Sequence, residues 1–266
     1  MAPTTYDTLA VATDARGVTR VTLARAAVMN AFDERMIAEL TGVFTALAAS
    51  SATRVVVLAA EGKAFCAGAD LQWMQRAAAN ALDDNLADAR RFAAMMQAIA
   101  TCARPVVAQV QGVAYGGGVG LCCAADIVVA SEAAKFSVSE ARFGILPAVI
   151  GPYLTNAVGK RHALRLALTA EVIDAHAAAQ LGLVQHVADA DALDAAVEQV
   201  VASLLGNGPG ALGEIKQLYA QLEVGPVTPA ISELTAQTIA RVRSGDEARE
   251  GFAAFFAKRA ASWVAQ

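Results

Sequence analysis

The glycine-rich segment Gly116–Gly120 constrains the fold of this chain more than any other stretch. It reads Gly-Gly-Gly-Val-Gly, follows the apolar run Pro105–Val110, which is typical of a buried strand, and precedes Leu121–Ala125, which favours a short helix. Glycines at such a turn let the backbone approach a ligand closely, and the first N–H groups of a helix have no partner inside it. The segment predicts an oxyanion hole, two N–H donors aimed at a developing negative oxygen, with tight packing as the alternative.

Two nucleotide-binding patterns do not fit this glycine run. The dinucleotide pattern G-x-G-x-x-G, started at Gly116, needs a glycine where Leu121 stands. Started at Gly118, it needs a glycine or alanine where Cys123 stands. The P-loop pattern fails as well, because no Gly-Lys-Ser/Thr follows. A dinucleotide or nucleoside triphosphate is therefore not the expected ligand.

Charge and hydropathy exclude several classes of partner. The 266 residues include 21 basic and 25 acidic ones, a formal charge of −4 without a basic patch, which argues against nucleic acid. No uninterrupted run of about 18 apolar residues appears, so we expect no membrane span. The first residues have neither the basic nor the apolar region of a secretory signal, and we expect a cytoplasmic protein.

The positions of cysteine and histidine argue against a metal site. The cysteines show neither C-x-x-C spacing nor a disulfide framework, and we interpret them as small apolar residues in a reducing compartment. The histidines are isolated along the chain, which disfavours bound zinc and a histidine-based triad. The residues concerned are Cys66, Cys102, Cys122, Cys123, His162, His176 and His186.

Strand and helix signals alternate over the first two-thirds of the chain. Val18–Arg25 alternates apolar and polar residues as a half-buried strand does, and Arg54–Ala60 is an apolar run typical of a buried strand. The repeated strand-strand-helix order predicts an α/β fold in which short turns stack as a spiral around a layered apolar core. Helical spacing along Glu34–Ala48 predicts an apolar face made of Met36, Ile37, Leu40, Val43, Phe44 and Leu47.

The remaining segments are predicted from the same signals. The weakly patterned stretch Arg76–Asp88 is interpreted as a mobile loop. After the break at Asn207–Gly210 the chain is predicted to be helical, and the aromatic stripe of Glu247–Trp263 predicts packing on another subunit or over the core. We divide the chain into a spiral core, residues 1–195, and a helical C-terminal region, residues 196–266. Other predicted helices are Leu86–Thr101, Val158–Ala170, Ala175–Leu181 and Asp191–Leu205, and other strands are Pro105–Val113 and Asp126–Ser131.

Three segments carry groups suited to catalysis. Lys63–Leu71 is a turn after a buried strand, where small residues around Gly68 leave N–H groups free for a ligand. The glycine run is the second segment. The third, Lys135–Gly144, places Glu140 among small and apolar residues, where burial raises a carboxyl pKa toward that of a proton shuttle. A surface carboxylate at a helix start is the alternative interpretation of Glu140.

These segments, in this order and spacing, resemble the crotonase (enoyl-CoA hydratase/isomerase) superfamily. The resemblance runs from about Val18 to the C-terminus, and the segment Glu250–Arg259 is similar to the closing helix of the family. It implies a crotonase-like spiral of repeated β-β-α turns, with C-terminal helices that join subunits into a homotrimer or a dimer of trimers. The matching motifs include Asn30-Ala31-Phe32, the turn Ala-Gly-Ala-Asp, and the runs P-V-V-A-Q-V-Q-G-V-A-Y-G-G-G and A-A-D-I-V-V-A.

The resemblance implies acyl-CoA thioester chemistry through an enolate. It assigns the oxyanion hole to the backbone N–H groups of Ala69 and Gly117 and the acid–base role to Glu140. No cofactor or metal is implied, because coenzyme A is part of the substrate. Phe255 and Lys258 would reach the coenzyme A of a neighbouring subunit, with core packing as the alternative for Phe255. The other residues implied to contact coenzyme A or the acyl group are Arg25, Asn30, Ala67, Asp70, Leu71, Gly116 and Arg142.

One position departs from the family pattern. Family hydratases carry a second glutamate where this chain has Gly120, and a single carboxylate suits a 1,3-proton shift better than hydration. The glycine run and Ser139–Pro152 nevertheless resemble the bacterial methylglutaconyl-CoA hydratase-like subgroup, which also has glycine there. Hydration of a 2-enoyl-CoA, with 3-methylglutaconyl-CoA of leucine degradation as the finer candidate, therefore ranks first. A 3-enoyl-CoA to 2-enoyl-CoA isomerase and a non-catalytic acyl-CoA-binding protein are the alternatives.

Two arginines are assigned roles as cations, each with a structural alternative. Arg142 follows Glu140 in the same segment and is the candidate partner for a distal substrate carboxylate, with a structural ion pair as the alternative. Arg25 is the candidate partner for a coenzyme A phosphate, and an exposed arginine at a strand end is the alternative.

Overall fold

A six-stranded sheet forms the centre of the structure, a computed structural model that describes residues 5–264. The strands lie in the order β1-β2-β3-β4-β6-β9, and every neighbouring pair is parallel except β1 and β2. Parallel neighbours need crossover connections, which helices supply here. The strands are β1 (Leu9–Thr13), β2 (Val18–Leu23), β3 (Val55–Ala60), β4 (Val106–Val110), β6 (Ile127–Ser131) and β9 (His186–Ala188).

A second sheet has three strands in the order β5-β7-β8. The chain passes from the large sheet to the small one before two of the helices: β4 leads to β5 and α4 (Gly117–Ala124), and β6 leads to β7 and then α5 (Gly151–Thr169). This order confirms the predicted spiral of strand-strand-helix turns. The strands of the small sheet are β5 (Val113–Tyr115), β7 (Lys135–Ser137) and β8 (Ile173–Asp174).

Gly112 divides the segment that was predicted to be one strand, Pro105–Val113. The chain leaves β4 after Val110 and enters β5 at Val113, so the prediction of a single strand was wrong. Gly112 has a φ of +61°, and a β-carbon there would lie 1.9 Å from the Lys63 carbonyl oxygen. Glycine is therefore required at this corner, which an apolar pattern alone does not reveal.

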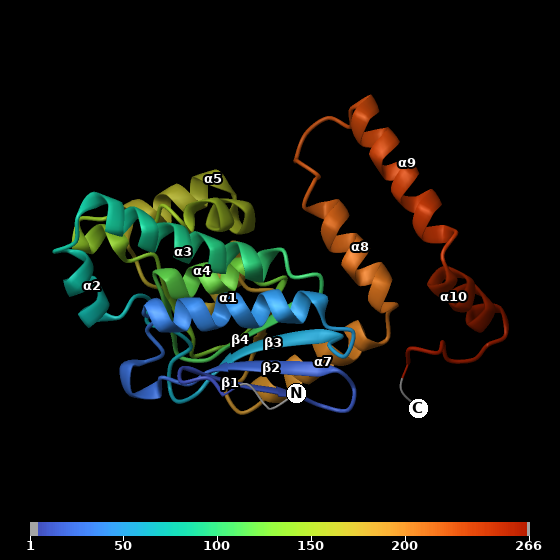
Figure 1. Ribbon diagram of the computed structural model, residues 1–266, viewed down its shortest axis with the longest axis horizontal. Coiled ribbons are helices and arrows are strands. Elements are labelled where there is room, and N and C mark those ends of the chain that lie inside the picture. Colours follow the sequence, from blue (N-terminus) through green and yellow to red (C-terminus); the bar gives the residue numbers. More distant parts are fainter. Residues whose placement is uncertain (1–4, 265–266) are drawn as a thin grey trace.

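Alternate residues of the large sheet face two separate cores. One face packs against α1 (Glu34–Ala49), α3 (Leu82–Ala100) and α4, and the other face packs against α7 (Leu193–Leu205), as Figure 1 shows. The six apolar residues predicted for the first helix are all buried, which confirms that face. In β3, Val56 and Leu58 belong to the first core and Val55, Val57 and Ala59 to the second.

The stretch Arg76–Asp88 is mostly helical, so its interpretation as a loop was wrong. Helix α2 spans Leu71–Ala77 and α3 begins at Leu82, which leaves a short connection. Asp70 caps α2 by accepting two backbone N–H bonds, a favourable start for a helix. The apolar pattern was weak because most side chains in the first turns of α3 are exposed. Two aspartates in the first turn of α3 interact favourably with the helix dipole: Asp83 and Asp84.

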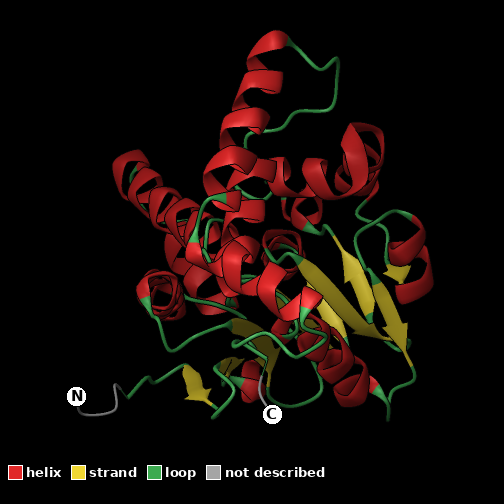
Figure 2. Cartoon of the chain, turned by 90° about the vertical axis from the view of Figure 1, so that its right-hand side faces the viewer, coloured by secondary structure: helices red, strands yellow, loops and turns green. Residues whose placement is uncertain are grey.

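The C-terminal helices extend away from the sheet (Figures 1 and 2). The region after Gly210 is helical as predicted, but not throughout, because the chain breaks between α8 and α9 and the last helix ends at Phe256, before Trp263. The Nζ atom of Lys216 lies 2.6 Å from Oδ2 of Asp126, and this ion pair connects α8 to the residue before β6. The helices are α8 (Pro209–Tyr219), α9 (Pro229–Arg243) and α10 (Asp246–Phe256).

The predicted division of the chain after residue 195 lies inside α7, a helix that packs on the sheet. The two-part organisation stays a prediction. Among the helices of residues 5–264, none combines the length and the apolar character that crossing a membrane requires. The shorter elements are η1 (Ala26–Val28), η2 (Glu140–Phe143) and α6 (Ala175–Gln180).

Candidate active site

The predicted catalytic groups meet in one cleft with a volume of about 520 Å³. Glu140, Ala69 and Gly117 all line it, although they come from three segments far apart in the sequence. The rest of the wall is largely apolar. A larger hollow, about 810 Å³, lies among α8, α9 and α10, but none of these three residues lines it. The smaller cleft is therefore the candidate active site.

Backbone contacts hold the two predicted oxyanion donors next to each other. Tyr115 donates its N–H to the Cys66 carbonyl at 2.9 Å, so the turn that leads to Ala69 runs beside β5. A β-carbon on Gly68 would lie 2.9 Å from the Tyr115 carbonyl oxygen and 3.7 Å from the Gly117 nitrogen. Within residues 5–264 neither the Ala69 N–H nor the Gly117 N–H has an acceptor. Both donors are free to bind a thioester oxygen.

Glu140 lies against the glycine turn. A β-carbon on Gly116 would be 3.2 Å from the Oε1 atom of Glu140. The Oε2 atom is buried and has no hydrogen-bond partner among the described residues. Burial raises the pKa of the Glu140 carboxyl above its ordinary value, because the charged form loses solvation. The carboxyl is thus suited to accept and return a proton beside the oxyanion donors.

Apolar side chains fill the place that a second carboxylate would need. A β-carbon on Gly120 would lie 2.4 Å from Cγ2 of Ile150 and 3.3 Å from Cε of Met96. Both side chains are fully buried. The branched side chain of Ile150 has few alternative rotamers, so its methyl group does not move aside cheaply. Glutamate at position 120 is incompatible with the present position of Ile150.

We expect Gly120→Ala to lower the free energy of unfolding by about 1–3 kcal/mol, the usual cost of overpacking a core. Ile150→Ala removes the methyl group that the new β-carbon meets. The double variant should therefore lose less stability than the sum of the two single variants, and urea unfolding measures all three.

Gly42→Ala is the matched control for this prediction. Gly42 is an exposed helical glycine of α1, and its β-carbon would meet nothing within 4 Å. Alanine favours a helix over glycine, so this variant should be as stable as the parent or more stable. Equal changes in the free energy of unfolding for the two alanine variants would show that the Ile150 side chain moves aside without cost.

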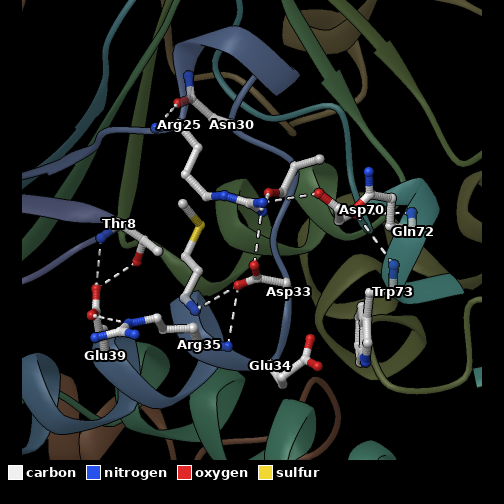
Figure 3. Close-up of polar contacts among 12 residues, drawn as sticks. Thr8, Arg25, Asn30, Asp33, Glu34, Arg35, Glu39, Asp70, Gln72 and Trp73 are labelled. Carbon is white, nitrogen blue, oxygen red and sulfur yellow. Dashed lines mark hydrogen bonds and ion pairs between the residues drawn. The ribbon is translucent and has the colours of Figure 1, made fainter. Parts of the chain in front are cut away.

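The Arg25 side chain points toward two aspartates, one of which, Asp70, follows Ala69 in the chain (Figure 3). Its Nη2 atom is 3.0 Å from Oδ2 of Asp70 and 3.2 Å from Oδ2 of Asp33, and Nη1 donates to the Ala31 carbonyl. The buried Asn30 side chain accepts the Arg25 N–H and donates to two backbone carbonyls. Arg25, Asn30 and Asp70 therefore hold the turn that presents Ala69. A contact of Arg25 with a phosphate stays a prediction.

Arg142 is the only cationic side chain among the described residues that line the cleft. Its Nη2 atom donates to the Ala170 carbonyl at 2.6 Å, so its partner is a backbone oxygen and not a carboxylate. Ala67, Leu71 and Gly116 line the same cleft, and Leu71 is 74% exposed. Of the nine residues predicted to contact coenzyme A or the acyl group, these four line the cleft and the other five do not.

Phe255 lies in the last turn of α10, Lys258 follows that helix, and neither residue lines the cleft of its own chain. Phe255 is 76% exposed, and its ring centroid is 5.6 Å from that of Phe256 in an edge-on arrangement. Packing within this chain does not bury it. Contacts of Phe255 and Lys258 with the coenzyme A of a neighbouring subunit stay a prediction, as does the trimer.

An aromatic wall of the cleft was missed from the sequence. The Phe32 ring centroid lies 5.1 Å from that of Phe92 and 6.2 Å from that of Trp73. A β-carbon on Gly117 would lie 2.2 Å from Cζ of Phe32, so this ring covers the glycine turn. Phe32 belongs to a matched motif and Trp73 lies close to the Ala-Gly-Ala-Asp turn, but no pattern showed that Phe92 reaches the cleft from α3.

No cluster of metal-ligating side chains accompanies this cleft. Among residues 5–264, no group of three or more His, Cys, Asp or Glu side chains is placed to hold a metal ion. Proton transfer and stabilisation of an enolate are within reach of the carboxyl group and the two backbone donors.

Comparison with known proteins agrees with the geometry of the cleft. The family model for enoyl-CoA hydratase/isomerase matches residues 13–266. A probable enoyl-CoA hydratase of Rhizobium meliloti is 35% identical over 97% of this chain and 98% of the relative. The 1,2-epoxyphenylacetyl-CoA isomerase of Escherichia coli is 31% identical over 92% of this chain and 94% of its own length.

Solved structures give the same result. The crystal structure of an enoyl-CoA hydratase from Shewanella pealeana is 39% identical, with a TM-score of 0.92 over 96% of each chain. Pseudomonas aeruginosa AtuE is 35% identical, with a TM-score of 0.93 over 97% of this chain and 100% of its own. These matches confirm the crotonase-like fold that the sequence predicted. The chain belongs to the enoyl-CoA hydratase/isomerase family.

Proposed function

We propose that this protein adds water to a 2-enoyl-CoA thioester. The observation that carries the proposal is the position of Glu140, whose carboxyl lies beside Gly116 in the cleft that two free N–H donors also line. A buried carboxyl next to such donors is the arrangement that proton transfer through an enolate requires. The names of the related enoyl-CoA hydratases support the same class of substrate.

The residues of the cleft suffice for a balanced reaction. The water oxygen bonds to the β-carbon of the substrate while one water proton passes to the Glu140 carboxylate. The π electrons of the C=C bond shift toward the thioester oxygen, and the enolate is stabilised by the N–H groups of Ala69 and Gly117. Glu140 then returns the proton to the α-carbon, and the thioester C=O re-forms. The product is a 3-hydroxyacyl-CoA.

Product analysis by mass spectrometry in water labelled with heavy oxygen tests this proposal. The purified protein is incubated separately with 3-methylglutaconyl-CoA, crotonyl-CoA and a 3-enoyl-CoA. A labelled 3-hydroxyacyl product establishes hydration, and the preferred substrate identifies the acyl class. Absence of turnover with all three would favour the non-catalytic acyl-CoA-binding protein.

An isomerase that converts 3-enoyl-CoA to 2-enoyl-CoA is the second candidate. The observation that favours it is the packing of Ile150 and Met96 at Gly120, which leaves Glu140 as the only carboxylate that lines the cleft within the described chain. One carboxyl group can remove a proton and return it two carbons away. A mass-neutral product from the 3-enoyl substrate, without incorporation of labelled oxygen, would select this function.

The finer substrate candidate, 3-methylglutaconyl-CoA, carries a distal carboxylate that Arg142 could bind. We expect Arg142→Ala to raise KM for this substrate by about tenfold or more, the value of one charge-assisted hydrogen bond. The KM for crotonyl-CoA, which has no distal carboxylate, should change little. Arg161→Ala, an exposed arginine of α5, is the control. Equal effects of Arg142→Ala on both substrates would remove Arg142 from acyl recognition.

The pH dependence of kcat/KM should report the ionisation of Glu140. The reaction starts from the carboxylate, so activity falls as the pH drops through the pKa of this group. Because burial raises the pKa of Glu140, the acidic limb should lie above the value of about 4.3 for an ordinary glutamate. Initial rates with crotonyl-CoA between acidic and neutral pH measure the limb. A limb at or below the ordinary value would show that Glu140 does not start the reaction.

A further inference from the structure

Hydration with one carboxylate requires another group to hold the attacking water. A carboxylate that accepts the water proton does not by itself fix the position of the water oxygen, and a bound water needs two or more polar partners. Few polar side chains line the cleft among the described residues. They are Trp73, Tyr115, Ser139, Glu140 and Arg142.

The Ser139 hydroxyl lies next to the Glu140 carboxyl at the glycine turn. A β-carbon on Gly116 would be 3.7 Å from Oγ of Ser139 and 3.2 Å from Oε1 of Glu140. The two oxygens therefore approach the same point, and because residue 116 is glycine, no side chain separates them. A water molecule there could bond to the hydroxyl and the carboxylate at the same time.

The hydroxyl group of Ser139 is not used by the fold. Ser139 precedes η2, but its side chain makes no capping hydrogen bond. Within residues 5–264 the hydroxyl has no other hydrogen-bond partner, in contrast to the Ser137 hydroxyl, which donates to the Ala170 carbonyl at 3.1 Å. A serine hydroxyl both donates and accepts, so it can hold a water whose proton points to Glu140.

The other polar side chains of the cleft fit this role less well. The Trp73 ring nitrogen donates only, and the Arg142 guanidinium also only donates, with one nitrogen already bound to Ala170. Tyr115 carries the other hydroxyl group among the lining residues. It is therefore the proper comparison for Ser139.

We propose that Ser139 holds the attacking water against Glu140 and so replaces the second carboxylate of two-glutamate hydratases. The inference rests on the proposed hydratase function. In the first step the water oxygen, hydrogen-bonded to the Ser139 hydroxyl, bonds to the β-carbon, and the water proton passes to the Glu140 carboxylate. Ser139 itself neither gains nor loses a proton over the cycle.

Two activities separate this role from a structural one. Hydration of crotonyl-CoA needs the water, whereas exchange of the α-protons of butyryl-CoA in deuterated water needs only Glu140 and the oxyanion donors. We expect Ser139→Ala to lower kcat for hydration by about 10- to 100-fold, the value of a hydrogen bond to a charged or reacting group. The exchange rate should stay within about twofold of the parent, because the acid–base pathway is intact.

Two further variants complete the experiment. Ser139→Thr retains the hydroxyl group and should recover most of the hydration that Ser139→Ala loses. Tyr115→Phe removes the other hydroxyl of the cleft and should lower hydration less than Ser139→Ala does. The opposite order for Tyr115→Phe and Ser139→Ala would assign the water to Tyr115 and overturn the proposal.

The outcomes distinguish failure of the proposed hydratase function from failure of the role of Ser139. If the parent protein hydrates no enoyl-CoA but exchanges α-protons, the proposed hydratase function fails, and the role of Ser139 fails with it. If the parent hydrates crotonyl-CoA and Ser139→Ala does so equally well, the role of Ser139 alone is overturned. Equal loss of hydration and exchange in Ser139→Ala would also overturn it, because Ser139 would then act by positioning Glu140.

Discussion

Glu140→Gln should lower kcat with the preferred enoyl-CoA by about 10²- to 10⁴-fold, the range in which a general acid–base group contributes. Glutamine keeps the size of the side chain but cannot take a proton from water or return one to the α-carbon. The residues around Glu140 offer no replacement, because no second carboxylate lines the cleft among residues 5–264. Steady-state kinetics with crotonyl-CoA and 3-methylglutaconyl-CoA measure the loss.

Binding and stability separate this catalytic effect from damage to the fold. The affinity for an acyl-CoA should stay within a few-fold of the parent, measured by calorimetry with butyryl-CoA. Because burial raises the pKa of Glu140, the ionised side chain lowers stability at neutral pH, so Glu140→Gln should unfold at an equal or higher urea concentration. Glu132→Gln changes an exposed residue between β6 and β7 and is the control. It should alter neither the acyl-CoA affinity nor the urea unfolding midpoint. Retained turnover in Glu140→Gln would place the acid–base group elsewhere.

Local patterns predicted much of the fold and the segments that form the candidate site. The apolar face of α1 follows from helical spacing, because its buried residues contact the core at intervals that the sequence displays. The oxyanion turns and Glu140 were also predicted, since short segments of the chain form each of them. Ala69, Gly117 and Glu140 line one cleft, but their catalytic roles stay a prediction.

What the sequence did not reveal depends on contacts between distant residues. The packing of Ile150 on Gly120 joins α4 to the residue before α5, and neither position signals the other. The role of Arg25 also depends on a distant partner. Asp70, which Arg25 contacts, belongs to the turn of Ala69, far from Arg25 in the sequence. The start of α3 was missed for a different reason: its exposed first turns show no apolar period, and only the aspartates mark them.

Removing the Ala69 N–H donor should slow the reaction by on the order of 100-fold or more, roughly 3 kcal/mol of transition-state stabilisation. No side-chain substitution tests this donor, because it belongs to the backbone. Lactic acid in place of alanine keeps the methyl group and exchanges the N–H for an ester oxygen. The Ala69 N–H has no acceptor within the described chain, so its loss removes no hydrogen bond of the fold. The exchange also makes the Gly68 carbonyl, which accepts the Phe32 N–H at 2.9 Å, a weaker ester acceptor, and the control must share this effect.

The same replacement at Ala230 is the matched control. Ala230 is exposed near the start of α9, where its N–H also has no acceptor among residues 5–264, and it does not line the cleft. Each ester weakens the preceding carbonyl as an acceptor, so both should lower the urea unfolding midpoint by a similar small amount, whereas only the ester at position 69 should lower kcat. An unchanged kcat for that ester would contradict the role of Ala69 in the reaction. The position of Glu140 beside Gly116 would then have to serve a reaction that does not pass through the predicted enolate, since one remaining donor, Gly117, does not make an oxyanion hole.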